Sequence, residues 1–173
     1  MNKEQTITGV IRGTGACVPK RILENKEIAG FVDTSDEWIR ERTGVRRRRI
    51  AEKETTVSMA CEAGRQAVEE ARISPDEIDM ILVATGSPDQ IFPCTACRVQ
   101  EALGADGAVG FDLNAACSGF LFAYNTAQAY IASGIYRTVL VIGSESISRL
   151  VDWTDRGTCI LFGDGAGAVL LQA

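Results

Sequence analysis

The stretch Gly110-Phe111-Asp112-Leu113-Asn114-Ala115-Ala116-Cys117-Ser118-Gly119-Phe120 decides the fold, because it joins two elements of different type. Residues 108–113 form an apolar run typical of a strand, and an apolar helical pattern begins directly behind Cys117. We therefore expect Cys117 in a sharp strand-to-helix turn. A thiol there lies beside unbonded N–H groups and the positive end of the helix dipole, which favour the thiolate. Cys117 is a candidate nucleophile; the alternative is a small cysteine buried in the turn.

Strand and helix patterns alternate on both sides of this turn. Apolar runs at 80–84 and 138–143 predict strands covered on both faces, and residues 6–13 predict a first strand closed by a turn at 15–19. Helices are expected at 25–31, from Thr34 or Ser35 to Gly44, and at 56–72, 93–103 and 120–131. Runs at 158–162 and 166–171, separated by Gly163-Asp164-Gly165, predict a tight hairpin. This order predicts an α/β domain with a mostly parallel five-stranded sheet, one antiparallel strand and packed helices.

Length and composition narrow the class of protein. A chain of 173 residues with 46% hydrophobic content fits one domain, residues 1–173. The net charge of −5 argues against general attraction to nucleic acid or to an anionic membrane, and no apolar run approaches membrane-spanning length. Six irregularly spaced cysteines without a signal-like N-terminus predict a reduced, cytoplasmic protein. The chain contains no histidine, so a catalytic Cys117 needs a proton-transfer partner from elsewhere.

Three further groups of side chains are candidates for ligand binding, partner contact, or metal and redox chemistry. Trp38 and Arg42 are four residues apart on one helix face, where they form either a surface cation–π pair or a stacking and charge site for a nucleotide. The arginines at 46–49 are interpreted as a solvated face, with phosphate or acidic-partner contact as the alternative, and an extended backbone would divide them between two sides. Cys94 and Cys97 form a Cys-x-x-Cys pair, interpreted as structural rather than as a metal or redox site, because no second pair and no histidine accompany it.

Several motifs coincide in one order along the chain. They are Thr34-Ser35-Asp36-Glu37-Trp38-Ile39 with Arg42-Thr43-Gly44, then Asp112 to Phe120, then Asp155-Arg156-Gly157-Thr158 and Phe162-Gly163-Asp164-Gly165-Ala166-Gly167. Together they resemble the β-ketoacyl-acyl-carrier-protein synthase III family. The resemblance implies one half of a thiolase-like layered fold, in which two similar α/β halves pack around shared central helices. It also favours the nucleophile interpretation of Cys117.

The resemblance implies roles for individual residues. Cys117 corresponds to the acyl-accepting cysteine. Trp38, Arg42, Arg156 and Thr34 correspond to residues at or beside the coenzyme A site, and Phe162 lines the acyl channel. Phe92 corresponds to a residue given across a homodimer axis to the neighbour's acyl pocket. The implied substrates are a short acyl-coenzyme A and malonyl-acyl-carrier protein, with no cofactor and no metal.

This sequence matches only the N-terminal half of the family pattern. The family's catalytic histidine and asparagine, and the glycine amide that completes its oxyanion hole, belong to the C-terminal half. We expect this chain to be inactive alone and to work with that half, whether as a fragment or with a second polypeptide. The alternatives are a polyketide-type or hydroxymethylglutaryl-type synthase and a non-catalytic dimerisation half.

Overall fold

The computed structural model describes residues 7–173, whose centre is a five-stranded sheet. The strands are β1 (Val10–Cys17), β4 (Met80–Ala84), β5 (Val109–Leu113), β6 (Thr138–Ser146) and β7 (Asp164–Gln172), in the spatial order β1-β7-β6-β4-β5. The pairs β4–β5 and β4–β6 are parallel, whereas β7 is antiparallel to both of its neighbours, β6 and β1. Four strands therefore run in one direction and β7 in the other, which confirms the predicted sheet.

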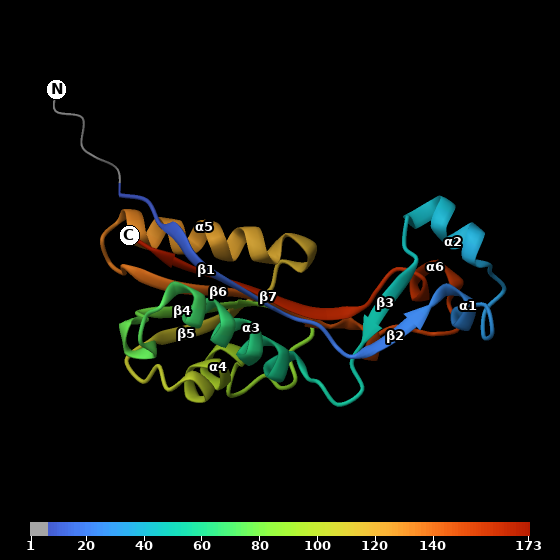
Figure 1. The fold of residues 1–173 in the computed structure, drawn as a ribbon, viewed down its shortest axis with the longest axis horizontal. Coiled ribbons are helices and arrows are strands. Elements are labelled where there is room, and N and C mark those ends of the chain that lie inside the picture. The colour runs from blue at the N-terminus through green and yellow to red at the C-terminus, as the bar shows by residue number, and fades with distance from the viewer. Residues whose placement is uncertain (1–6) are drawn as a thin grey trace, which may run out of the picture.

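Helices cover both faces of this sheet (Figure 1). Helices α3 (Thr56–Ala71) and α4 (Thr95–Leu103) lie on one face, and α5 (Gly119–Ala132) lies on the other. Alternation along β4 explains the two cores, since Ile81 and Val83 pack toward α3 and α4, whereas Met80 and Leu82 pack toward α5. Every residue of β4 is buried, as its continuous apolar run predicts.

Small residues allow β1 and α3 to approach closely. A Cβ atom at Gly15 would lie 2.0 Å from the carbonyl oxygen of Ala63, and one at Gly13 would lie 2.1 Å from that of Ala67. Both positions therefore need glycine, because the helix backbone occupies the space of a side chain. The α3 backbone at Ala63 and Ala67 thus packs directly against β1.

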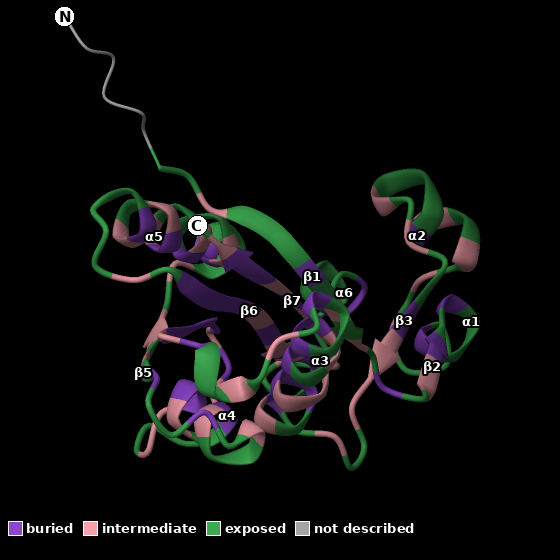
Figure 2. Ribbon diagram, turned by 60° about the vertical axis from the view of Figure 1, so that its left-hand side comes forward, coloured by how far each residue is buried: buried purple, intermediate pink, exposed green. Residues whose placement is uncertain are grey.

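A smaller lobe extends from the sheet and has its own core (Figure 2). It contains β2 (Arg21–Glu24) paired antiparallel with β3 (Arg47–Ile50), and the helices α1 (Asn25–Ile28), α2 (Asp36–Thr43) and α6 (Arg156–Cys159). Leu23, Ile28, Ile39 and Ile160 form its buried centre. Single turns of 3₁₀-helix complete the chain: η1 (Pro75–Glu77), η2 (Ala116–Ser118) and η3 (Ile147–Arg149).

Three expectations from the sequence need correction. The hairpin at 158–171 is wrong: Asp155 caps the helical turn α6 by accepting bonds from the Gly157 amide and the Thr158 hydroxyl, and only β7 is a strand. The predicted turn at 15–19 is also wrong, because β1 continues to Cys17, while Thr6 lies outside the described residues. The sheet formed by β2 and β3 was not predicted, since each strand has only four residues.

Within residues 7–173, none of the helices combines the length and the apolar character needed to cross a bilayer.

Candidate active site

Cys117 lies in the turn between β5 and α5, as predicted. Strand β5 ends at Leu113, Cys117 is the middle residue of η2, and α5 begins two residues later. Ala116 has a φ of 47°, in the left-handed region that an alanine rarely adopts. Such backbone strain is concentrated at functional sites. The thiol is exposed, which excludes the alternative of a buried cysteine that packs the turn.

The amides around Cys117 are unequally used. The Ala116 amide donates to Asn114 Oδ1 at 3.3 Å, and the Ser118 amide donates to the Ala115 carbonyl at 3.1 Å. Among residues 7–173, no acceptor is found for the Cys117 amide. An unbonded amide on the nucleophile's own residue can donate to an oxygen that becomes negatively charged there.

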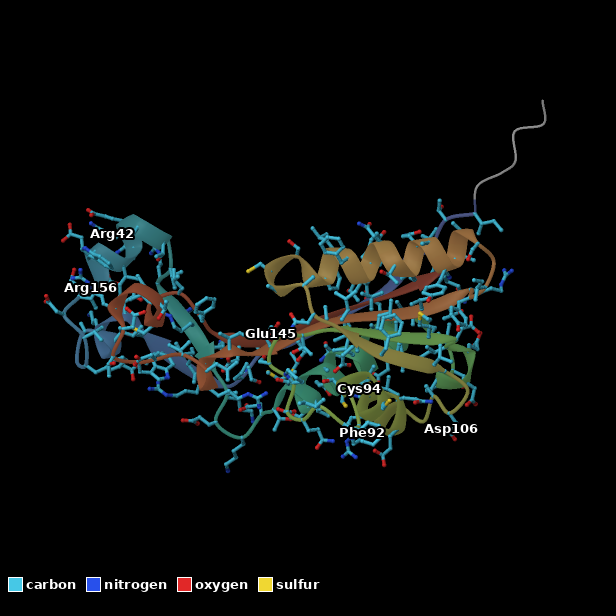
Figure 3. All side chains as sticks on the ribbon, turned by 180° about the vertical axis from the view of Figure 1, so that it is seen from behind. Arg42, Phe92, Cys94, Asp106, Glu145 and Arg156 are labelled. Atoms are coloured by element: carbon cyan, nitrogen blue, oxygen red, sulfur yellow. The ribbon has the colours of Figure 1, made fainter. Side chains whose placement is uncertain are left out.

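A second group of predicted residues gathers in the smaller lobe. The Arg42 guanidinium lies over the Trp38 ring at 4.1 Å from its centroid, and the Arg156 guanidinium lies over the same ring at 4.8 Å. Arg42 and Arg156 are 114 positions apart in the sequence, yet Figure 3 shows them at the same end of the molecule. One aromatic ring with two guanidinium groups combines a stacking surface with positive charge.

Helix α2 presents Trp38 and Arg42 because its ends are well defined. Ser35 caps the helix by accepting a bond from the Trp38 amide at 3.0 Å, and Gly44 ends it with a φ of 72°. Arg156 is held from the other side, since it donates to the Asp33 carbonyl at 3.1 Å. The predicted ends of α2 thus position Trp38 and Arg42, and the bond to the Asp33 carbonyl positions Arg156 of α6 beside them.

No pattern in the sequence singled out Arg48, which organises this lobe. Its side chain is buried and donates to Asn25 Oδ1 at 2.9 Å and to the Ile160 carbonyl at 2.8 Å. Burial lowers the pKa of the guanidinium, because desolvation disfavours its charge. The arginine run is extended in β3 from Arg47 onward, but a fully solvated face is wrong, since Arg48 ties β3 to α1 and to the end of α6.

The remaining predicted residues lie at separate places. Thr34 is half-buried just before α2, and its hydroxyl has no hydrogen-bond partner among the described residues. Phe162 is 38% exposed, between α6 and β7. Phe92 is 90% exposed, and it precedes α4 together with the equally exposed Ile91. Within residues 7–173 these side chains do not form a closed acyl pocket: Phe92 lies near Cys94, away from Arg42 and Arg156 (Figure 3).

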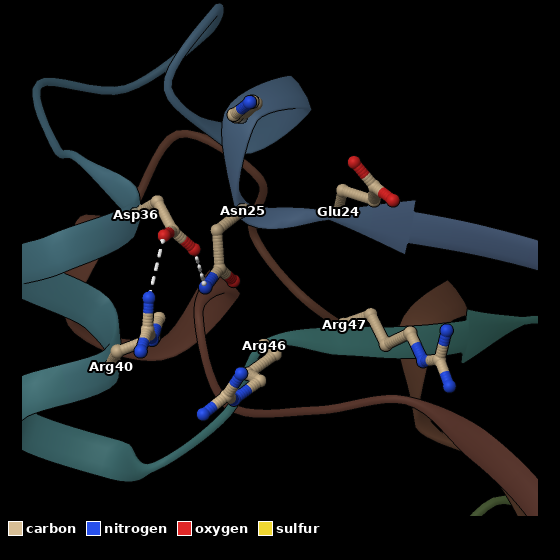
Figure 4. A pocket seen from close by; sticks show the side chains of 7 residues that line it. Glu24, Asn25, Asp36, Arg40, Arg46 and Arg47 are labelled. Carbon is tan, nitrogen blue, oxygen red and sulfur yellow. Dashed lines mark hydrogen bonds and ion pairs between the residues drawn. The ribbon is translucent and has the colours of Figure 1, made fainter.

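A charged groove of about 450 Å³ runs beside α2 (Figure 4). Its lining residues are Glu24, Asn25, Lys26, Asp36, Arg40, Arg46 and Arg47. Asp36 is already engaged, because its carboxylate accepts a bond from Asn25 at 2.9 Å and pairs with Arg40 at 3.4 Å. The bond from Asn25, and then the one from Arg40, lower the pKa of Asp36. Neither Trp38 nor Cys117 lines this groove.

Glu145 is a polar centre that sequence reasoning missed. It lies at the end of β6, where its carboxylate accepts bonds from the Ser87 hydroxyl and, at 2.8 Å, from the Gly86 amide. A Cβ atom at Gly86 would be 3.6 Å from Glu145 Oε1 and 3.7 Å from Asn114 Oδ1. Glu145 thus fixes the loop after β4 beside Asn114, three residues before Cys117.

Comparison with known proteins gives a consistent result. A family model described as 3-Oxoacyl-[acyl-carrier-protein (ACP)] synthase III matches residues 111–173. The Beta-ketoacyl-[acyl-carrier-protein] synthase III of Rhizobium meliloti (strain 1021) is 55% identical over 168 residues, covering 96% of this chain and 52% of the relative. The crystal structure of 3-oxoacyl-[acyl-carrier-protein] synthase III from Aquifex aeolicus VF5 aligns with a TM-score of 0.94 at 52% identity, over 95% of this chain and 54% of that one. This chain matches the N-terminal half of a β-ketoacyl-acyl-carrier-protein synthase III.

A polyketide relative has the same architecture. The priming β-ketosynthase from the R1128 polyketide biosynthetic pathway aligns with a TM-score of 0.93 at 40% identity, over 99% of this chain and 52% of that one. The predicted resemblance to synthase III and the thiolase-like fold class are therefore both confirmed. The chain spans about half the length of the curated relatives that it matches.

Proposed function

We propose that this chain forms the first half of a condensing enzyme that initiates fatty acid synthesis. The observation that carries the proposal is the exposed Cys117, at a strained turn before α5 and with an unbonded amide of its own. This arrangement provides a nucleophile and one donor for the oxyanion that its attack creates. The similarity over more than nine-tenths of the chain to synthase III proteins supports the same reaction.

The reaction has two steps. In the first, the Cys117 thiolate attacks the thioester carbonyl of a short acyl-coenzyme A, preferably acetyl-coenzyme A, and coenzyme A leaves as its thiolate. In the second, malonyl-acyl-carrier protein loses carbon dioxide, and the resulting carbanion attacks the acyl carbon on Cys117. The cysteine is released as a thiolate, and the β-ketoacyl product on the carrier protein is two carbons longer than the acyl group. The histidine and asparagine that hold the enolate oxygen belong to the second half.

The smaller lobe is the proposed coenzyme A site. Trp38 offers a ring for adenine stacking, and Arg42 and Arg156 offer charge for phosphate, with Thr34 beside them. In Figure 1 the start of α5 is directed toward this lobe, so a long, flexible ligand bound there can extend its thioester toward Cys117. We assign Phe162 and the partner subunit's Phe92 to the acyl pocket.

Two exposed apolar surfaces fit the proposed partners. The outer face of α5 exposes Leu121 and Phe122 at 65% and 55%, although its inner face packs on the sheet. Two large apolar side chains exposed side by side mark an interaction surface, and the second half found in the longer relatives is the proposed cover. The exposed Phe92 loop fits a homodimer contact. The free state of all six cysteines fits a cytoplasmic protein.

The test is reconstitution. Residues 1–173 are combined with a synthase III C-terminal half, and condensation of acetyl-coenzyme A with malonyl-acyl-carrier protein is measured. We expect product from the combination, none from residues 1–173 alone, and none from the combination carrying Cys117→Ser. Product formed by residues 1–173 alone at a comparable rate would refute the claim that essential catalytic groups lie in the second half.

A polyketide-type starter reaction is the second candidate, favoured by the similarity to the R1128 priming synthase. It uses the same Cys117 chemistry and differs in the acyl group and the carrier protein. Competition between carrier proteins of the two pathways in the reconstituted assay separates the two candidates.

A further inference from the structure

Cys94 and Cys97 form a close pair of sulfur atoms at the start of α4. Their sulfur atoms are 3.4 Å apart, and both side chains are half-buried. In Figure 3 Cys94 lies near Phe92, in the part of the molecule away from Arg42 and Arg156. None of the proposed catalytic steps uses this pair.

The backbone at Cys94 gives the pair a geometry that two cysteines inside a helix lack. Cys94 is the N-cap of α4, with extended angles of φ −67° and ψ 165°, and Cys97 is the third residue of the helix. The expectation that Cys94 lies inside the helix is therefore wrong. Because the Cys94 backbone has already left the helix, its side chain can turn back toward Cys97, and a disulfide needs the sulfurs to close to about 2.0 Å.

From this geometry we propose that Cys94 and Cys97 form a reversible disulfide, by exchange with a small-molecule or protein disulfide. The Cys94 thiolate attacks one sulfur of the external disulfide, forms a mixed disulfide and releases one thiolate. The Cys97 thiolate then attacks the Cys94 sulfur, and the second external thiolate leaves. Two protein thiols are oxidised to one disulfide, the external disulfide is reduced to two thiols, and the two protons pass to solvent or to the released thiolates.

The surroundings of the pair determine which cysteine reacts first. The hydrogen-bonded contact with Cys94, followed by burial, raises the pKa of the Cys97 thiol, and the nearby Asp112 adds to this. Asp112 also accepts the Thr95 and Ala96 amides at 2.8 Å each, so it takes the first amides of α4. Cys97 is therefore the poorer first nucleophile, and we assign Cys94 as the attacking thiol. Once Cys94 is held in the mixed disulfide its hydrogen-bonded contact with the Cys97 thiol is lost, and Cys97 can give up its proton to solvent and attack.

The other four cysteines provide internal comparisons. Cys61 lies on the neighbouring helix α3, and burial raises the pKa of its thiol. Within the described part of the chain, the pair at 94 and 97 is the one pair of cysteine sulfurs in hydrogen-bond contact. Trypsin, which cleaves after lysine and arginine, releases residues 73–98 as one peptide, and this peptide contains Cys94 and Cys97 and no other cysteine.

The experiment measures the redox state of this peptide. The 173-residue chain is equilibrated in buffers of oxidised and reduced glutathione, free thiols are blocked with an alkylating reagent, and tryptic peptides are weighed. We expect peptide 73–98 to become two hydrogen atoms lighter and resistant to alkylation in oxidising buffer, and to return to the doubly alkylated form after reduction. Cys61→Ser should leave this change intact, whereas Cys94→Ser and Cys97→Ser should each abolish it.

The variants also test the order of attack. Cys97→Ser should accumulate a glutathione adduct on Cys94, whereas Cys94→Ser should accumulate far less on Cys97. Peptide 73–98 that remains doubly alkylated at every redox ratio would overturn the proposal, and so would loss of the light species in Cys61→Ser. These outcomes do not depend on acyl transfer, so they leave the proposed function untouched.

Discussion

Replacement of Arg48 by methionine tests how the smaller lobe is held together. Arg48→Met removes the bonds to Asn25 Oδ1 and to the Ile160 carbonyl, but keeps most of the side chain's apolar length. Two charge-assisted hydrogen bonds at about 1.5–3 kcal/mol each give a gross loss of about 3–6 kcal/mol. Removal of a buried charge also removes its desolvation cost, so we expect a net loss of about 2–3 kcal/mol.

Tryptophan fluorescence reports selectively on the unfolding of this lobe. The protein has two tryptophans, Trp38 and Trp153, and both pack against the core of the smaller lobe. With a urea m-value of about 2 kcal/mol/M, Arg48→Met should move the fluorescence midpoint down by about 1–1.5 M. The control is Arg47→Met, an exposed arginine on the same strand, which should change stability by less than about 0.5 kcal/mol. Equal midpoints for the two variants would refute the structural role assigned to Arg48.

Three other perturbations follow from the structure. In the reconstituted enzyme, Trp38→Ala and Arg42→Ala should each weaken acyl-coenzyme A binding by about 1–3 kcal/mol, whereas the control Arg40→Ala on the same helix should not. Calorimetric titration measures these affinities. Equal effects of all three substitutions would show that the coenzyme A site is assigned to the wrong residues. Gly15→Ala should destabilise the fold by about 1–3 kcal/mol or prevent folding, because its Cβ would meet a helix carbonyl, whereas Gly107→Ala has open space; identical melting temperatures would contradict the close packing of β1 on α3. The pKa of Glu54 is lowered from 4.5 to about 2 by its own backbone amide and those of Glu52, Lys53 and Lys20, so its stabilising effect is complete above pH 4.5 and is lost as the pH falls toward 2; Glu54→Gln should melt with a weaker pH dependence over this range, and an unchanged profile would count against these bonds.

The main sheet and its helices could be predicted because their signals are local. The apolar run of β4 and the cap residues of α2 each determine one element through nearby residues alone. The turn that carries Cys117 was predictable for the same reason, since small residues separate a strand pattern from a helix pattern.

The features that were missed depend on contacts distant in sequence. The pairing of β2 with β3 joins segments about 25 residues apart, and the bond from Arg48 to Ile160 spans 112 positions. The apolar residues at 158–162 gave a strand signal because the core of the smaller lobe buries Cys159 and Ile160, which the sequence alone does not show. The helix predicted at 93–103 begins two residues later, at Thr95, because Asp112 rather than a local residue accepts the first amides of α4.

Mass mapping after incubation with acetyl-coenzyme A tests the central claim most directly. In the reconstituted protein we expect one acetyl group on the tryptic peptide 99–137, whose only cysteine is Cys117, and its loss in Cys117→Ser. The peptides that carry Cys17, Cys61, Cys94 with Cys97, and Cys159 should remain unmodified. An acetyl thioester on any of those peptides, or an unmodified peptide 99–137 in an enzyme that still forms product, would contradict the assignment of Cys117 as the acyl acceptor.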